Sequence, residues 1–574
     1  MIDIDGMGYL FRRTLRLLFL ILFFNLFFKF SYAQTQDLKE SLVDRERQRV
    51  FKEEPQKEKI PETPKLELKK EPEEIPTAAE AEVKFFIAKI KVEGCTVFSQ
   101  EEINKIISPY QNKEFSLIEL KELAEKITQL YHKNGYITSK AYIPPQRIKE
   151  KEVIIKVVEG KIGEINITGN KYFKSSFIKS AFRNLESKIL NQKDLEKVLI
   201  YLNRNPNLEV VGVLEKGKVP ETTDIRLLVK DRLPSHLRYT FNNQGTRLTK
   251  NLRHILTYTN TNLLGFGDTF LLQVPFAEEG MVKGFSANYL VHLDKEGTDL
   301  GFISSLTKVK IGKEFKPSNI IGRSRLNSIY ITKPFFYKRK FFNQFKISLE
   351  SIDSKTTILG EKLFLNRLGV LSLGLATNLQ DKNGRTYISN QFDFGFPDFL
   401  GALPKDNPLA SPRDSDNQFI RYNFSFSRFQ ILPYSSYLLF NSNLQLTTDV
   451  LPSQKRFYLG GADSIRGYPE DDFGGDYGIS NNIEFVCPIF IIPDRIKFKE
   501  KKLKDLLKFA IFTDFGILFN RGEDEKPLLA GSGFGLRFNI NRNITSKFDI
   551  GWPLADKPTD RSSYNVHFSL NIEY

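Results

Sequence analysis

The chain has 574 residues, which is too long for one ordinary domain and predicts two or three folding units. Hydrophobic residues make up only 41% of it, yet it contains 50 Phe and 22 Tyr. After the N-terminus no apolar run reaches about 18 residues, which excludes a bundle of membrane-spanning helices. A β-barrel fits this composition, because only the lipid-facing half of its strand residues must be apolar.

Charge and cysteine content exclude several other classes. The formal net charge is +15, but the basic residues are scattered and no nucleic-acid motif accompanies them. A basic surface beside anionic lipid head groups is therefore favoured, with no nucleic-acid partner. Cys95 and Cys487 fall in different predicted domains, so they form no disulfide framework. Since no nucleophile with its base, phosphate loop or metal spacing occurs, we expect no enzyme activity, catalytic residue, metal or cofactor.

The first 33 residues are typical of a secretory signal. Three arginines precede the apolar stretch 17–28, and a small-x-small cleavage site ends at Ala33. We expect the mature chain to begin at Gln34. A retained membrane anchor and a translation start at Met7 are the alternatives.

Residues 34–82 are rich in Glu, Lys and Pro, and they cannot bury a core. Residues 37–54 lack Gly and Pro and could form a charged helix. Prolines recur through residues 55–76, which predicts an extended linker.

An internal repeat follows, with copies at residues 83–162 and 163–232. Each copy opens on the pattern x-Ile-x-(Val/Ile)-x-Gly and then predicts the order β-α-α-β-β. In the first copy we expect capping boxes at Ser99 with Glu102 and at Ser116 with Glu119. The remaining predicted elements of the two copies are helix 117–132, strands 138–143 and 153–159, then strand 164–168, helices near 175–182 and from Asn191, and strands 208–214 and 223–230.

In residues 233–574 the helical period disappears, and apolar and polar residues alternate instead. Phe345, Ile347 and Leu349, for example, alternate with polar neighbours, and the final ten residues alternate in the same way. The region has room for about sixteen strands, an even number as a bacterial barrel requires. A soluble β-sandwich is the alternative, but its outward face should not be this aromatic.

Two such modules before a barrel resemble the two-partner-secretion transporters, the TpsB family of ShlB/FhaC/HecB-type haemolysin secretion proteins. The modules resemble POTRA domains, on the strength of residues 130–139, 158–162 and 202–206. The resemblance implies α+β periplasmic modules followed by a C-terminal transmembrane antiparallel β-barrel in the outer membrane.

The barrel motifs strengthen this resemblance. Residues of the family's lumen loop, (Val/Ile)-Arg-Gly-(Phe/Tyr), are matched by Ile465, Arg466, Gly467 and Tyr468, and the family's strand motif is matched by Phe512, Asp514 and Gly516. The resemblance implies that Arg466 folds into the lumen and meets Asp514. Burying an arginine inside a barrel costs free energy unless the charge is paired or hydrated. We therefore interpret the Arg466–Asp514 pair as a functional latch rather than as part of a solvated surface turn. Tyr574 resembles the terminal aromatic that the barrel-assembly machinery recognises.

The family resemblance implies a translocator that recognises an unfolded exoprotein through its POTRA modules and exports it through its barrel. The expected partners are a TpsA-like haemolysin or adhesin, the barrel-assembly machinery and outer-membrane lipids, and residues 37–54 could plug the lumen. The POTRA sheet would capture the passenger by adding its strand to an edge or in the groove between strand and helix. The alternatives are a barrel-assembly insertase, a passive porin and a scaffold for other envelope proteins.

Overall fold

The computed structural model describes residues 66–68, 84–148, 151–338, 340–498, 500–522, 526–541 and 543–574. The predicted signal sequence and the candidate plug helix at residues 37–54 lie outside these ranges. Among the described residues, no helix is both long and apolar enough to cross a bilayer.

The first module contains β2 (Lys84–Ile87), β3 (Lys89–Glu93), α3 (Gln100–Ile107), η2 (Ser108–Tyr110), β4 (Lys113–Ser116), α4 (Leu117–Lys133), β5 (Lys140–Tyr142) and β6 (Glu152–Val158). Its main sheet has the order β3-β6-β5, with β3 and β6 parallel. Both predicted capping boxes are confirmed, at Ser99 and Ser116. The small antiparallel pair β2–β4 was not predicted, because four residues carry too little alternation to be recognised.

The second module contains β7 (Lys161–Thr168), α5 (Ser175–Ser180), η3 (Arg183–Leu185), α6 (Gln192–Asn203), β8 (Leu208–Lys216) and β9 (Thr222–Asp231). Its sheet has the order β1-β8-β9-β7. The outermost strand, β1 (Leu66–Leu68), comes from the predicted linker and pairs in parallel with β8.

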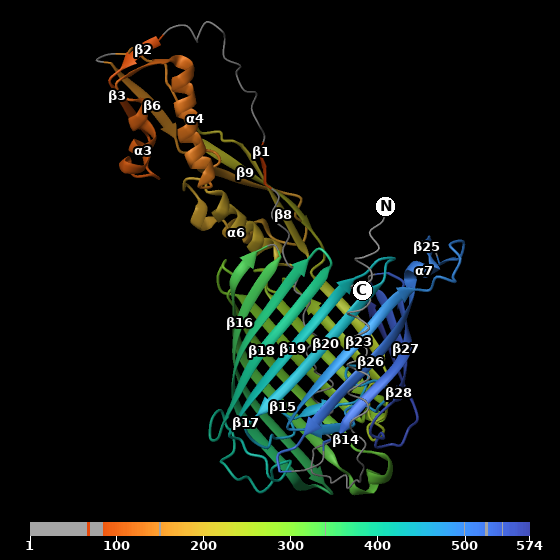
Figure 1. Cartoon of the computed structure of the whole chain (residues 1–574). Helices are drawn as coiled ribbons and strands as arrows, with labels where there is room; N and C mark the ends of the chain where they lie inside the picture. Colours follow the sequence, from red (N-terminus) through yellow and green to blue (C-terminus); the bar gives the residue numbers. More distant parts are fainter. Residues whose placement is uncertain are drawn as a thin grey trace. The chain divides into compact units, whose positions relative to one another are not determined.

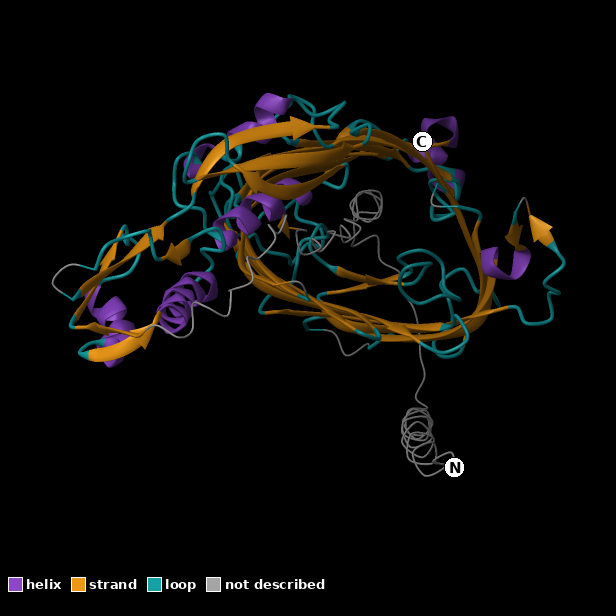
Figure 2. Ribbon diagram, turned by 90° about the horizontal axis from the view of Figure 1, so that it is seen from above, coloured by secondary structure: helices purple, strands orange, loops and turns teal. Residues whose placement is uncertain are grey.

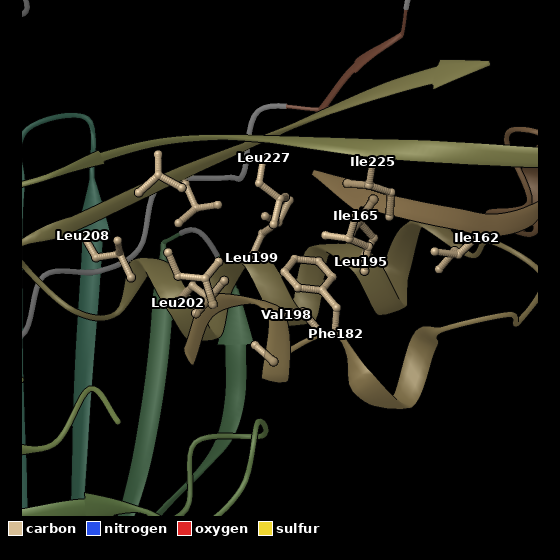
Figure 3. Packing of buried hydrophobic residues seen from close by; sticks show 14 of the residues in the cluster. Ile162, Ile165, Phe182, Leu195, Val198, Leu199, Leu202, Leu208, Ile225 and Leu227 are labelled. Atoms are coloured by element: carbon tan, nitrogen blue, oxygen red, sulfur yellow. The ribbon is translucent and has the colours of Figure 1, made fainter. Parts of the chain in front are cut away.

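Helix α6 packs its apolar stripe against the sheet of the second module, as Figure 3 shows. Leu195, Leu199 and Leu202 are almost completely buried and face Ile225 and Leu227 of β9. Burial of each such side chain contributes about 1.5–3 kcal/mol. The period of 3.6 on the helix and of 2 on the strand therefore produces this α/β contact.

The two modules repeat the same loop geometry. Gly94 and Gly169 have φ values of +83° and +93°, and a Cβ on either would lie 2.3 Å from a backbone oxygen of the neighbouring strand. The loop after Gly94 is held by Glu159, which accepts the N–H groups of Thr96 and Val97 at 2.7 and 2.9 Å.

In the second module Asp231 takes the place of Glu159. It accepts the N–H groups of Lys171, Tyr172 and Phe173 at 2.7–3.0 Å. Burial raises the pKa of Asp231, but these hydrogen bonds lower it by more. The repeat seen in the sequence is therefore a repeat of backbone caps as well as of strands and helices.

Sixteen of the remaining described strands form one closed antiparallel barrel, and Figures 1 and 2 show them side by side around a ring. They are β10 (Ser235–Asn242), β11 (Arg253–Asn260), β12 (Thr269–Ala277), β13 (Val282–His292), β14 (Asp299–Lys310), β15 (Ile321–Lys338), β16 (Phe341–Ile358), β17 (Glu361–Asp381), β18 (Gly384–Phe396), β19 (Phe419–Ile431), β20 (Tyr437–Thr447), β23 (Tyr477–Pro488), β26 (Leu507–Phe519), β27 (Leu528–Asn539), β28 (Ile544–Pro553) and β29 (Asn565–Glu573). The predicted fold class is confirmed, including the strand number.

The faces of the strands alternate as lipid and lumen require. On β27, Phe534 and Leu536 point outward and stay exposed, whereas Leu529 and Arg537 point inward and are buried. Strand β10 starts just after the second module ends. The rim that carries Ser235 is therefore the POTRA-side rim, and the connections alternate between the two rims from there.

Candidate functional site: a loop anchored inside the barrel

The connection between β20 and β23, residues 448–476, leaves the rim opposite the POTRA side. It contains a small hairpin of β21 (Phe457–Leu459) and β22 (Phe473–Gly475). Gly460 and Gly467 have φ values of +110° and +106°, which L side chains rarely adopt. These two glycines let the chain turn sharply, once before Ile465 and once between Arg466 and Tyr468. All three of these residues are 0–2% exposed.

Arg466 contacts the inner wall through Asp514. Its Nε donates to one carboxylate oxygen at 2.8 Å and its Nη2 donates to the other at 2.9 Å. The backbone N–H of Arg466 donates to the same carboxylate at 3.0 Å. Asp514 lies on β26 between the outward-facing Ile511 and Phe515, so its own side chain points into the lumen. The structure thus brings together the arginine and the aspartate that the resemblance paired.

The pair belongs to a larger buried cluster. Arg466 Nη1 also donates to Glu484 on β23. Arg537 on β27 donates to Glu484 at 2.7 and 2.9 Å and to Asp549 on β28 at 2.6 Å. Lys547 lies 3.4 Å from Asp549. Three cationic and three anionic side chains therefore face one another, and the cluster is formally neutral.

Apolar contacts surround the guanidinium. Its Cζ lies 3.5 Å from the centre of the Phe512 ring, so the ring supplies a cation–π contact. Ile465 and Tyr468 pack with Leu459, Leu518 and Leu529 in one buried cluster. Because each ionic partner is hydrogen-bonded and water is largely excluded, removal of one partner should cost more than the intact pair contributes.

Glycines on the wall allow the loop to approach so closely. A Cβ on Gly531 of β27 would lie 1.8 Å from the carbonyl oxygen of Arg466. A Cβ on Gly551 of β28 would lie 2.6 Å from the nitrogen of Gly467. Gly516, from the predicted strand motif, would place a Cβ 2.8 Å from Leu459. The strand motif therefore supplies both the anion at Asp514 and room for the loop at Gly516.

A second set of contacts holds the base of the loop. Lys455 reaches Glu350 on β16 at 2.8 Å, and its carbonyl accepts from Arg421 on β19 at 2.8 Å. Arg421 is itself paired with Asp393 on β18. The loop is therefore anchored to two different parts of the barrel wall, β16–β19 and β23–β28, by two separate ionic clusters.

Of the predicted site residues, Tyr574 alone lies outside this assembly. Its side chain is 90% exposed at the POTRA-side rim, and its backbone pairs with Leu237 at 2.8 and 2.9 Å, which closes the seam between β10 and β29.

Sequence reasoning missed Glu484, Arg537, Asp549 and Gly531. Two signals could have found them. Charged residues at inward positions of neighbouring strands suggest pairing partners. The run Gly531-Ser532-Gly533-Phe534-Gly535 places three glycines on one strand face, which indicates close backbone approach.

The chemistry of the site is electrostatic and steric. In the described part of the chain, no group of three His, Cys, Asp or Glu side chains is placed to hold a metal ion. The ionic contacts hold the loop against the inner wall of the barrel.

Comparison with protein families gives two matches. Residues 85–160 match the ShlB-type POTRA domain. Residues 221–538, more than half of the chain, match the haemolysin secretion/activation protein family ShlB/FhaC/HecB.

Individual relatives agree with this. The heme/hemopexin transporter protein HuxB of Haemophilus influenzae is 25% identical over 487 residues, covering 82% of this chain and 83% of the relative. The outer membrane transporter CdiB of Dickeya dadantii is 22% identical over 494 residues, with coverage of 82% and 83%.

Solved structures share the fold. CdiB from Escherichia coli superposes with a TM-score of 0.69 at 20% identity, covering 95% of this chain and all of that one. BamA from Haemophilus ducreyi, lacking POTRA domains 1–3, gives a TM-score of 0.53 at 15% identity, covering 85% of this chain and all of that one. These structures share the fold, and the family match over more than half of the chain shows that the chain belongs to the ShlB/FhaC/HecB family of outer-membrane two-partner-secretion transporters.

Proposed function

We propose that this transporter exports one unfolded exoprotein, a TpsA-like haemolysin or adhesin, which its POTRA modules recognise in the periplasm. Family membership supports the class of passenger, since the matched family is that of haemolysin secretion/activation proteins. The chain performs no covalent chemistry in this scheme. Folding of the passenger outside the cell would prevent its return.

The observation that carries the recognition step is the β8 edge of the second POTRA sheet, which is occupied by the short strand β1. Strand β8 is paired with β9 on one side, and on the other side it accepts β1, with Leu66, Glu67 and Leu68 opposite Gly212, Val213 and Leu214. This edge therefore accepts an extended segment through main-chain hydrogen bonds, which require little sequence specificity. A passenger strand that displaced β1 would use the same groups.

A proline in β1 tests this step. Glu67→Pro removes a backbone donor from the added strand, whereas Glu67→Ala keeps it. If β1 competes with the passenger, Glu67→Pro should increase binding of the unfolded exoprotein to the full-length transporter in detergent, and Glu67→Ala should not. Equal binding by both variants would show that the passenger is captured elsewhere.

We further propose that the 448–476 loop is a lid and that the Arg466–Asp514 pair is its latch. The support is the burial of the contact, since both residues are at most 2% exposed. Two hydrogen bonds join their side chains, and a third runs from the backbone N–H of Arg466 to the Asp514 carboxylate. The passenger would thread the lumen after the latch and a plug formed by residues 37–54 move aside.

The division of the chain is part of the proposal. It comprises a signal peptide at 1–33, a plug and linker at 34–82, POTRA modules at 83–162 and 163–232, and the barrel at 233–574. Tyr574 would serve as the signal for the barrel-assembly machinery during biogenesis, and outer-membrane lipids would surround the barrel.

A barrel-assembly insertase is the second candidate, and the likeness to BamA is the observation that favours it. That likeness, at 15% identity, shows the fold alone. The seam that an insertase would open is paired here from Arg238 to Asn242 with Glu573 to Ser569, and Arg238–Glu573 and Thr240–Asn571 contacts reinforce it.

Deletion of the gene separates these functions. Loss of one secreted protein, encoded beside this transporter, would support export, whereas general failure of barrel biogenesis would support the insertase. A passive porin would keep its solute flux after residues 84–230 are removed.

A further inference from the structure

One connection at the POTRA-side rim differs from its neighbours. The turns at 382–383 and 432–436 are short, but the connection between β23 and β26 runs from residue 489 to residue 506. It contains β24 (Lys497–Phe498), β25 (Lys501–Lys502) and α7 (Leu503–Leu506). We call residues 489–508 the rim hairpin.

Large apolar side chains of the rim hairpin face solvent. Phe490 is 69% exposed and Ile491 is 89% exposed, and Ile496 and Phe498 are also exposed. Four large apolar side chains exposed within nine residues are unusual for a surface that meets only water, and they suggest contact with a membrane or a partner.

The hairpin lies against the lipid-facing wall rather than over the lumen. The Phe498 ring meets the ring of Phe538 with centroids 6.4 Å apart. Phe538 lies on the same face of β27 as Phe534 and Leu536, whose exposed side chains define the outward face. The rim hairpin therefore contacts the outer face of the barrel wall at the POTRA-side rim.

Basic residues accompany the apolar ones. The rim hairpin contains seven Lys and Arg residues against three Asp and Glu residues, so its net charge is 7 − 3 = +4. Asp494 is paired with Lys502 at 2.8 Å and with Lys504. These hydrogen bonds lower the pKa of Asp494 to about 2, so the pairs persist at neutral pH and hold the segment together.

The neighbouring turn extends the patch. Tyr434, in the turn between β19 and β20, is 83% exposed. Lys508 Nζ donates to the carbonyl of Ser435 at 3.0 Å, which ties this turn to the rim hairpin. An aromatic ring beside lysines and aliphatic side chains is the composition of a membrane interface.

We propose that the rim hairpin is a lipid-binding element that seats on the periplasmic leaflet and recognises anionic phospholipid. Phe490, Ile491 and Phe498 enter the boundary between head groups and acyl chains, and the lysines contact phosphate groups. The lipid-facing position of Phe498 and the positive charge favour a membrane over a protein partner. This inference needs only the barrel's orientation and is independent of the passenger.

A depth measurement on the full-length chain tests the proposal. In a Cys95→Ser, Cys487→Ser background, a nitroxide label is attached at Ile491→Cys and the protein is reconstituted in phosphatidylcholine with or without phosphatidylglycerol. The label at position 491 should be more accessible to oxygen than to an aqueous nickel chelate. The ratio of these two accessibilities should be larger with phosphatidylglycerol than with phosphatidylcholine alone. A label at Leu359→Cys, which is exposed in the turn at the opposite rim, should stay aqueous in both.

Charge reversal identifies the lipid chemistry. Each lysine near an anionic surface contributes about fivefold to binding, so the loss of two lysines weakens it about 25-fold. Lys497→Glu with Lys501→Glu also adds two negative charges and should therefore weaken the binding of the rim hairpin to phosphatidylglycerol membranes at least about 25-fold. The matched control, Lys313→Glu with Lys316→Glu, changes the same charge at the opposite rim and should have no effect. Heat-modifiable electrophoretic mobility verifies that each variant still folds.

Three outcomes would overturn the proposal. An aqueous label at position 491 in both lipids would remove the membrane contact. If the label at position 491 has the same depth in both lipids and charge reversal does not change it, the rim hairpin does not recognise anionic phospholipid. Protection that arises only when the unfolded exoprotein is added would identify a protein-docking surface instead.

Discussion

The guanidinium of Arg466 donates two separate hydrogen bonds to the carboxylate of Asp514, from Nε to Oδ2 at 2.8 Å and from Nη2 to Oδ1 at 2.9 Å. Forty-eight residues separate them in the chain, and one lies on a loop while the other lies on a strand. This bidentate geometry is specific to arginine and carboxylate.

Replacement of Arg466 should release the lid. Arg466→Ala leaves Asp514 buried without its main cation, at a cost of about 3–5 kcal/mol to the closed loop. We expect reduced export of the exoprotein and larger single-channel conductance in planar bilayers. Arg466→Lys keeps the charge but loses the bidentate contact. Its export and conductance should lie between those of the unmodified transporter and those of Arg466→Ala. Unchanged export by Arg466→Ala, in a barrel that is still assembled, would remove the latch from the mechanism.

The glycine on the wall should be as sensitive as the arginine. In Gly531→Ala the new Cβ would meet the Arg466 carbonyl oxygen at 1.8 Å, so the loop must shift, at a cost of about 1–3 kcal/mol. The control is Gly374→Ala on β17, where a Cβ meets nothing nearer than 3.7 Å. Conductance should change in the first variant and stay constant in the second. The same conductance in both would show that the loop tolerates a displaced backbone.

The buried carboxylate of the first POTRA module makes a pH-dependent contribution. Burial raises the pKa of Glu159, but hydrogen bonds from Thr96, Tyr131 and Val97 lower it by more, so it lies below its ordinary value of 4.5. Folding therefore favours the ionised form. The resulting stability is fully present at neutral pH and is lost as the pH falls below about 4.5 towards the folded pKa.

Glu159→Gln should remove this contribution, destabilising the module by about 1–3 kcal/mol at pH 7 and flattening its dependence on acid. Hydrogen exchange of the Thr96 and Val97 amides in the full chain measures the effect. Glu122→Gln, on the exposed face of α4, is the control. Amide protection that stays the same in Glu159→Gln would contradict the role of this cap.

The ion pair across the barrel seam should matter much less. Arg238 and Glu573 are joined at 2.8 Å, but their side chains are 42% and 34% exposed. Such pairs contribute at most about 1 kcal/mol, and the backbone ladder between β10 and β29 remains when one partner is removed. Glu573→Ala should leave the temperature of barrel unfolding in heat-modifiability gels nearly unchanged. A large decrease would show that the seam depends on its side chains.

Local patterns were sufficient for most of the fold. The capping serines Ser99 and Ser116 were predicted because the interaction closes within three residues. Alternation along strands predicted a barrel of the observed strand number, since lipid and water on opposite faces impose a period of two. The β2–β4 pair escaped prediction, because its strands are too short for either period to appear.

The site was likewise only partly predictable from the sequence. Arg466 and Asp514 could be paired through a family resemblance, but periodicity alone contains no information about which strands become neighbours. The charges of Glu484, Arg537 and Asp549 meet only after the strands containing them are side by side, and the glycine at position 531 acquires its role only when a loop rests on it.

The sequence by itself determined the secondary structure, the order of modules and the membrane-facing pattern, because these depend on interactions between near neighbours and on the solvent of each face. Only the tertiary structure decided that β1 occupies the edge of β8, that two ionic clusters hold one loop, and that the rim hairpin rests on the outer wall. Each of these joins residues distant in the chain, and their meeting depends on barrel closure and register rather than on any local preference.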